Sequence, residues 1–197
     1  MIPAELVVDR DVFSVLRGEC EKIIDTRKRI PDFVFRRAFA KYVVVEHSYI
    51  WSNDFGAFLS ALSAIFADNA VNYMSIDPDP VDCYRSRSGF FGLASFKSSS
   101  LVERYTPAMT LNLGSSLVAG GNVGAFWGSS LQWGIICDRI SWEIAVIALA
   151  KDVDVPEISG FRCMDASQLS VCINNDYSWD PAVASDFNKR FFANYPI

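Results

Sequence analysis

The side chains that most often carry acid–base, nucleophilic or metal chemistry are few in this sequence. His47 is the only histidine, and it follows directly after Glu46. A Ser–His or Cys–His pair would have to combine His47 with a residue remote in the sequence, and two histidines cannot share a metal ion within this chain. A single histidine beside a hydrophobic strand is more often a structural residue. The sequence therefore predicts no catalytic residue, no metal ligand and no cofactor.

The cysteines are widely spaced and form no Cys-x-x-Cys pair. They are Cys20, Cys83, Cys137, Cys163 and Cys172. Charges at Glu5, Asp9 and Arg10 interrupt the N-terminal segment, which does not resemble a secretory signal. An odd, unpatterned set of cysteines without such a signal is typical of reduced, mostly buried thiols. We therefore expect a soluble, cytoplasmic protein, in which a reactive thiol would need a base nearby.

Two glycine-rich segments invite comparison with phosphate-binding loops. Gly114 is followed by two serines, and residues 120–124 read Gly-Gly-Asn-Val-Gly. Neither segment has the lysine of a P-loop or the G-x-G-x-x-G spacing of a dinucleotide site. A turn is the better interpretation of both.

Acidic residues are concentrated in particular segments. The net charge is −5, and residues 42–82 hold six acids and no lysine or arginine. Carboxylates gather on two turn-like segments, one with Asp77, Asp79 and Asp82 and one with Asp152, Asp154 and Glu157. The first segment allows three interpretations: a surface turn with a helix N-cap, a rigid partner-binding loop, or a hard-cation or acid-pair site without EF-hand spacing. We expect both segments to contribute to a partner-binding surface.

Nucleic acid and membranes are disfavoured as partners. The one basic cluster, residues 27–29 with Arg36 and Arg37, is interleaved with acids as on a salt-bridged helical face. A sequence pI near 4.9 predicts weak affinity for phosphate backbones. The longest apolar stretch, residues 144–150, is far shorter than the ~20 residues that span a bilayer. Trp127, Trp133 and Trp142 are expected to fill the core or to anchor an interface.

Hydrophobic periodicity and capping residues predict a single α+β domain over residues 1–197. Helical segments are expected within residues 9–28, 33–40, 53–66, 80–85 and 100–104 and from Pro181 onward. Strands are expected at residues 42–46 (or an extended link there), 71–76, 90–96, 131–137 and 142–149, with a turn at 119–124. The last two strands are close enough in sequence to form a hairpin. We expect an antiparallel sheet of four to six strands with helices packed mainly on one face.

Three stretches together resemble a known class of proteins. They are Ile-Pro-Asp-Phe-Val-Phe-Arg-Arg-Ala-Phe-Ala-Lys-Tyr-Val-Val-Val-Glu-His at 30–47, Asp-Pro-Asp-Pro-Val-Asp at 77–82, and Trp-Gly-Ile-Ile-Cys-Asp-Arg-Ile-Ser-Trp-Glu-Ile-Ala-Val-Ile at 133–147. The combination resembles small cytoplasmic immunity proteins that accompany bacterial polymorphic toxins or toxins of type VI secretion. The resemblance implies a non-enzymatic inhibitor that occludes the active site of a cognate toxin. Many such toxins are basic, and an acidic inhibitor would be steered to them electrostatically.

Two other functions stay open on the sequence. One is an enzyme with an unfamiliar site built from Glu46, His47 and a cysteine, which should lose turnover when His47 is replaced by alanine. The other is a homo-oligomeric scaffold held together by aromatic surfaces, which light scattering on the purified chain would detect.

Overall fold

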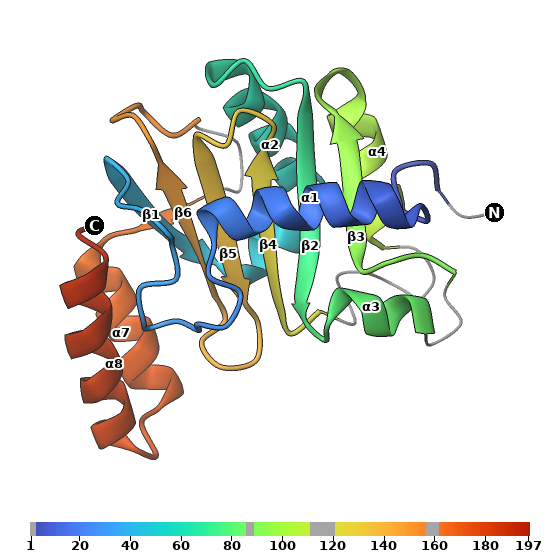
Figure 1. Ribbon diagram of the computed structural model, residues 1–197. Helices are drawn as coiled ribbons and strands as arrows, with labels where there is room; N and C mark the ends of the chain where they lie inside the picture. Colours follow the sequence, from blue (N-terminus) through green and yellow to red (C-terminus); the bar gives the residue numbers. More distant parts are fainter. Residues whose placement is uncertain (1–2, 86–88, 111–120, 157–161) are drawn as a thin grey trace.

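A computed structural model describes residues 3–85, 89–110, 121–156 and 162–197 (Figure 1). Its centre is an antiparallel seven-stranded sheet in the order β3-β2-β4-β5-β6-β1-β7. The strands are β1 (Lys41–Glu46), β2 (Ala70–Asp77), β3 (Leu93–Lys97), β4 (Val123–Gly128), β5 (Trp133–Asp138), β6 (Ile144–Leu149) and β7 (Cys163–Met164). The α+β class is confirmed, with slightly more strands than expected.

Helices lie before, between and after the strands in the sequence. They are α1 (Arg10–Ile23), α2 (Asn53–Ile65), α3 (Pro80–Cys83), α4 (Leu101–Met109), α7 (Ala166–Asp176) and α8 (Pro181–Asn194), with short 3-10 turns η1 (His47–Trp51) and η3 (Ser98–Ser100). No helix in the described ranges is long and apolar enough to cross a bilayer.

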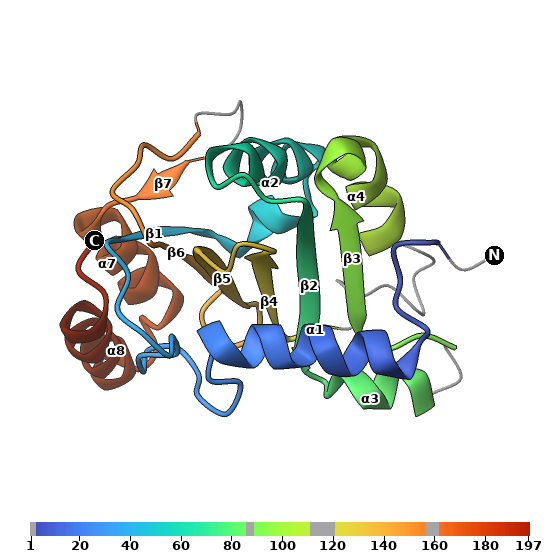
Figure 2. The ribbon, with the colours of Figure 1, turned by 45° about the horizontal axis from the view of Figure 1, so that its top comes forward.

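The sheet separates two hydrophobic cores. Along the fully buried strand β6, Ala145 and Ile147 face one core and Val146 and Ala148 face the other, as the two-residue period of a strand requires. Helices α2 and α4 cover the first face, whereas α1 crosses the second face and α7 and α8 extend it beyond β1 (Figure 2). The expectation of helices mainly on one face is therefore corrected, because strands buried on both sides need cover on both sides.

Several predicted elements are present because their capping signals are local. The Ser52 hydroxyl accepts a hydrogen bond of 3.2 Å from the Phe55 amide and begins α2. Asp180 caps α8 at its Val183 amide, with Pro181 as the first helical residue. The hairpin of β5 and β6 is also confirmed.

The predicted helix at residues 33–40 is wrong. The Val34 amide donates to the Tyr195 hydroxyl at 3.0 Å, and the Arg36 amide donates to the Ile23 carbonyl at 2.7 Å. Tyr195 lies far from this segment in the sequence, and Ile23 belongs to the preceding helix α1. Because these groups accept the hydrogen bonds of the two amides, the segment does not need helical hydrogen bonds. Its rings pack instead on the second core, where Phe35 lies against Tyr42 and Tyr195.

Strand β4 was missed because the turn-like glycines before it hid its start. Residues 123–128 include two glycines and an alanine beside Phe126 and Trp127, and every one of them is buried. Residues 119 and 120 of the predicted turn lie outside the described part of the chain. Helix α7 was missed too, although Asp165 and Gln168 form a capping box that the sequence spells out.

Candidate functional site

The structure separates the two acidic segments that the sequence singles out. Asp77 lies at the end of the sheet where Asp138 and Glu46 also lie, as the strand registers show. Asp152 follows β6 at the opposite end, where its Oδ1 lies 3.4 Å from Nζ of Lys41. Asp154 is exposed beside it, and Glu157 lies outside the described residues. The five predicted carboxylates that the structure describes therefore do not form one surface.

Asp77, Asp79 and Asp82 have local partners and still face solvent. Asp79 accepts a hydrogen bond of 2.8 Å from the Val81 amide and caps α3. Asp82 lies 3.5 Å from Arg85, and Asp77 accepts a hydrogen bond from the Asn122 side chain at 3.3 Å. All three side chains are exposed. The N-cap interpretation is confirmed for Asp79, and the carboxylates stay available to a partner.

A surface of large rings lies at the same end of the sheet as Asp77. Trp142, in the connection between β5 and β6, lies against Tyr177 with the ring centres 4.9 Å apart, and Tyr177 in turn contacts Trp179 at 5.9 Å. Trp179 is 75% exposed and Ile140 is 62% exposed. We call this surface the aromatic corner and define it by Ile140, Trp142, Glu143, Asp176, Tyr177 and Trp179, which line a shallow hollow of about 360 Å³ together with Ser141.

The aromatic corner is fixed from below. The Trp142 indole donates a hydrogen bond of 2.9 Å to the Ile30 carbonyl, and the Tyr177 hydroxyl donates one to the Ser141 carbonyl. Trp142 also packs on Phe187 of α8, with the ring centres 4.2 Å apart. Trp142 and Tyr177 are therefore held in place before any partner arrives, which reduces the entropy lost on binding.

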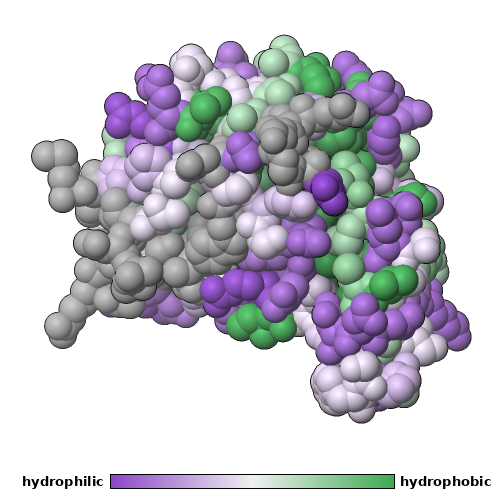
Figure 3. Space-filling model, turned by 180° about the vertical axis from the view of Figure 1, so that it is seen from behind, coloured by the Kyte–Doolittle hydropathy of each residue, from purple (hydrophilic) through white to green (hydrophobic). Residues whose placement is uncertain are grey.

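Two carboxylates border these rings. Glu143 has a φ of 52°, a left-handed conformation that a non-glycine residue adopts only when its surroundings hold it there. Its carbonyl accepts a hydrogen bond of 2.8 Å from the His47 amide, which holds this turn against β1. Asp176 closes α7 on the other side of the hollow. Seen from the back, hydrophilic residues gather over α7 and α8 at the lower right (Figure 3).

Sequence reasoning missed the aromatic corner except for Trp142. Its residues come from 140–143 and 176–179, which only the packing of α7 and α8 brings together. One signal was available, because residues 174–180 are rich in Asn and Asp yet contain Tyr177 and Trp179. A tryptophan in a polar turn before a proline has no place in a core and suggests a contact surface.

The Glu46–His47–cysteine arrangement is only partly assembled. Glu46 lines a cavity of about 500 Å³ with Cys163 and Cys172. His47 is buried, and burial together with the positive charge of Arg139 lowers its pKa to about 4. Burial raises the pKa of both thiols, and the carboxylates of Asp176 and Glu46 raise that of Cys172 further. At neutral pH this environment keeps both cysteines in the thiol form, which is a poor nucleophile.

The described residues hold no group of three or more His, Cys, Asp or Glu side chains placed to bind a metal ion. Searches with this chain found no match among protein-family models, curated proteins or solved structures.

Proposed function

We propose that this chain binds a basic protein partner through the aromatic corner and so neutralises it, the partner being a bacterial toxin as the immunity-protein resemblance implies. The observation that carries the proposal is the 75% exposure of the Trp179 side chain beside Glu143 and Asp176. A tryptophan this exposed gains apolar contact only from another molecule.

The chemistry of the corner suits a cationic partner. Tryptophan and tyrosine are enriched among the residues that dominate binding energy, and rings bordered by carboxylates attract lysine and arginine side chains. The net charge of −5 adds long-range attraction for a basic protein. Binding of this kind would cover the partner's active site and needs no catalytic residue in the inhibitor.

The Asp77 segment can flank the same interface. It follows β2, which is three strands away from β6, a lateral separation of about 14 Å at the usual spacing between strands. A standard interface buries about 800 Å² on each partner, enough to include both the corner and this segment. The Asp152 segment lies at the other end of the sheet and would stay outside that contact.

The experiment that tests the proposal expresses the product of the neighbouring reading frame in bacteria with and without this chain. We expect growth arrest without the chain and growth with it. Trp179→Ala should abolish protection while the circular dichroism spectrum and unfolding midpoint stay unchanged, because an exposed side chain contributes little to stability. Val171→Ala, on an exposed position of α7, is the matched control and should protect fully. Full protection by Trp179→Ala, or no protection by the wild type, would refute the proposal.

A further inference from the structure

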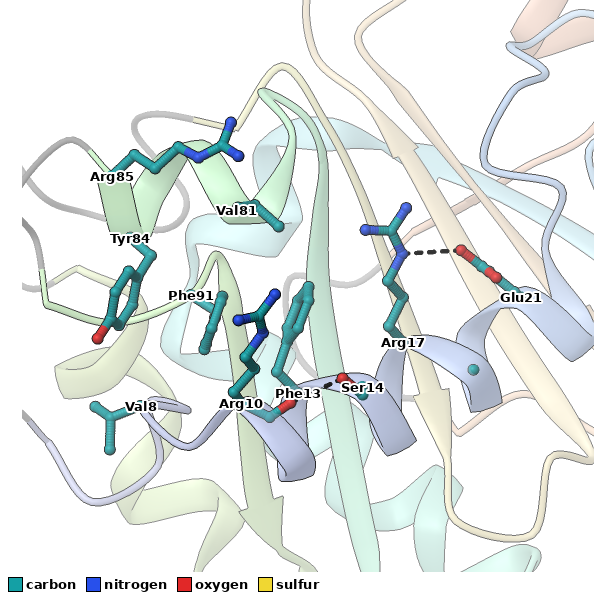
Figure 4. A pocket seen from close by; sticks show the side chains of 11 residues that line it. Val8, Arg10, Phe13, Ser14, Arg17, Glu21, Val81, Tyr84, Arg85 and Phe91 are labelled. Atoms are coloured by element: carbon teal, nitrogen blue, oxygen red, sulfur yellow. Dashed lines mark hydrogen bonds and ion pairs between the residues drawn. The ribbon is translucent and has the colours of Figure 1, made fainter.

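Another cavity lies between α1 and α3, on the same face of the sheet that α7 and α8 extend, and the proposed function does not use it. Its volume is about 640 Å³, within the usual range for small-molecule sites. Its walls come from α1, from α3 and from Phe91 at the start of the segment leading into β3 (Figure 4).

One side of this cavity is a stack of aromatic rings. Phe13 and Phe91 lie 4.2 Å apart and almost parallel, and Tyr84 stacks on the far side of Phe91 at 4.7 Å. The Tyr84 side chain is 46% exposed, so the stack ends in a ring that solvent reaches. Val8 and Val81 extend the apolar surface next to it. A planar ring could continue this stack at little entropic cost.

Three arginines also line the cavity. Arg10 and Arg17 extend from α1 towards α3, and the side chain of Arg85 lies along α3 (Figure 4). Arg17 pairs with Glu21 at 2.9 Å through Nε, and Arg85 with Asp82 at 3.5 Å through Nη1, so each keeps further N–H donors. Arg10 has no ion-pair partner within the part of the chain that the structure describes.

Three arginines around one cavity stand out in a protein with a net charge of −5. Glu21 and Asp82 pair with Arg17 and Arg85, whereas Arg10 has no ion pair among the described residues. Guanidinium groups bind phosphate by paired hydrogen bonds, and they do so best where the surroundings are partly apolar. The aromatic stack and the arginines, side by side in one cavity, therefore suit a ligand that has an anionic end and a flat, apolar end.

We propose that this cavity binds a small phosphorylated molecule with an aromatic ring, of the size of a mononucleotide. The ring stacks on Tyr84, and the phosphate accepts hydrogen bonds from Arg10 and from the free donors of Arg17 and Arg85. This site is independent of the aromatic corner, so its occupancy and the binding of a protein partner can be measured separately.

Gly18 offers a way to close the cavity without disturbing the fold. It lies in the middle of α1 and lines the cavity, and a Cβ placed on it would meet no atom within 4 Å. A leucine at this position would extend into the open space. It would also favour the helix over glycine, so the unfolding midpoint should not fall.

The test is calorimetric titration of the full chain with adenosine 5′-monophosphate, adenosine and inorganic phosphate. We expect saturable binding of the monophosphate and affinities at least about tenfold weaker for adenosine and for phosphate, since each lacks one half of the recognition. Arg10→Ala should weaken binding of the monophosphate about tenfold or more. Gly18→Leu should abolish it with an unchanged or raised unfolding midpoint.

The matched control is Lys189→Ala, which removes one positive charge from an exposed position on α8. It should bind the monophosphate as the wild type does. Absence of saturable binding to the wild type at millimolar monophosphate would overturn the proposal. So would unchanged affinity in a folded Gly18→Leu protein, because the ligand would then lie elsewhere.

Discussion

The indole Nε1 of Trp133 donates a hydrogen bond of 2.6 Å to Oδ2 of Asp68, a residue 65 positions earlier in the chain. Both side chains are buried. The other oxygen of Asp68 accepts hydrogen bonds from the Ser130 amide at 2.5 Å and the Ser129 hydroxyl at 3.4 Å. A buried carboxylate thus ties the end of α2 to the turn between β4 and β5. Asp68 belongs to the acid-rich stretch of the sequence, but its role is structural.

Asp68→Asn should lower the free energy of unfolding by about 2 kcal/mol. The NH₂ group of the new side chain is itself a hydrogen-bond donor, so it cannot accept the hydrogen bond that the carboxylate oxygen in its place accepted. Urea unfolding followed by tryptophan fluorescence measures the change. Asp152→Asn is the matched control, since the Asp152 side chain is 82% exposed and its replacement should alter stability by less than about 0.5 kcal/mol. Equal effects at the two positions would contradict the assignment.

Gly128 is required by the same network. A Cβ on this residue would overlap Oδ2 of Asp68 and lie 2.5 Å from Nε1 of Trp133, both of which are held by their hydrogen bond. We expect Gly128→Ala to destabilise the protein by about 2–3 kcal/mol through overpacking. Gly18→Ala is the opposite case, in a helix with open space, and should stabilise by about 0.5–1 kcal/mol. Thermal unfolding of the two variants checks both signs.

His47 should make stability depend on pH. Its pKa is about 4 in the folded protein and 6.5 as an ordinary value, because burial and Arg139 disfavour the charged ring. Between these values the unfolded chain binds more protons than the folded one, so the free energy of unfolding falls as the pH drops from 6.5 towards 4. The loss amounts to at most about 3 kcal/mol.

His47→Gln isolates this contribution, since the carboxylates that titrate in the same range are common to both proteins. The wild type should lose more stability than the variant between pH 7 and pH 4.5 in urea unfolding. Parallel curves would show that the ring is protonated as easily in the folded state as in the unfolded one.

Cysteine reactivity tests the environment around Glu46. Cys163 is exposed, Cys172 is half-buried, and Cys20 and Cys137 are buried. Because burial raises the pKa of these four thiols, their alkylation by iodoacetamide should be slow at pH 7, should begin within this set at Cys163, and should speed up towards pH 9. Cys20 and Cys137 should react only in urea. Peptide mass spectrometry reads each position, and modification of Cys163 or Cys172 faster than free cysteine at pH 7 would favour the enzymatic alternative.

The fold could be predicted from the sequence where the signals are local. Ser52 and the apolar stripe after it specify α2, and the strands β5 and β6 follow from two apolar runs joined by a short polar turn. Residues 33–40 have the same kind of apolar spacing, but their amides are taken by Tyr195 and Ile23, which no local pattern contains. The prediction failed where hydrogen bonds to distant parts of the chain replaced those of a helix.

The candidate site was less predictable for the same reason. The prolines and acids of this segment correctly indicated an exposed segment with Asp79 as an N-cap, although Asp77 ends β2 and Asp82 lies in α3. It could not indicate that Ser141 and Tyr177 meet through a hydrogen bond and thereby bring Trp179 beside Glu143. That contact depends on how α7 and α8 pack beyond the edge of the sheet.

The two acidic segments lie at opposite ends of the sheet, so charge reversal at each end can show which end contacts a basic partner. Glu143→Lys with Asp176→Lys reverses the charge at the aromatic corner, and Asp152→Lys with Asp154→Lys makes the same change of net charge at the opposite end. If the corner forms the interface, the first pair should weaken affinity for the cognate toxin about a hundredfold at low salt, by local repulsion next to Trp179. The second pair changes only the long-range field. Its effect on affinity should be about threefold or less and should vanish when salt shortens the Debye length to about 3 Å.

Titration calorimetry at low and high salt separates the two effects. Repulsion between groups in direct contact persists at high salt, whereas screening removes the effect of distant charges. Equal losses for both pairs at high salt would place the interface elsewhere.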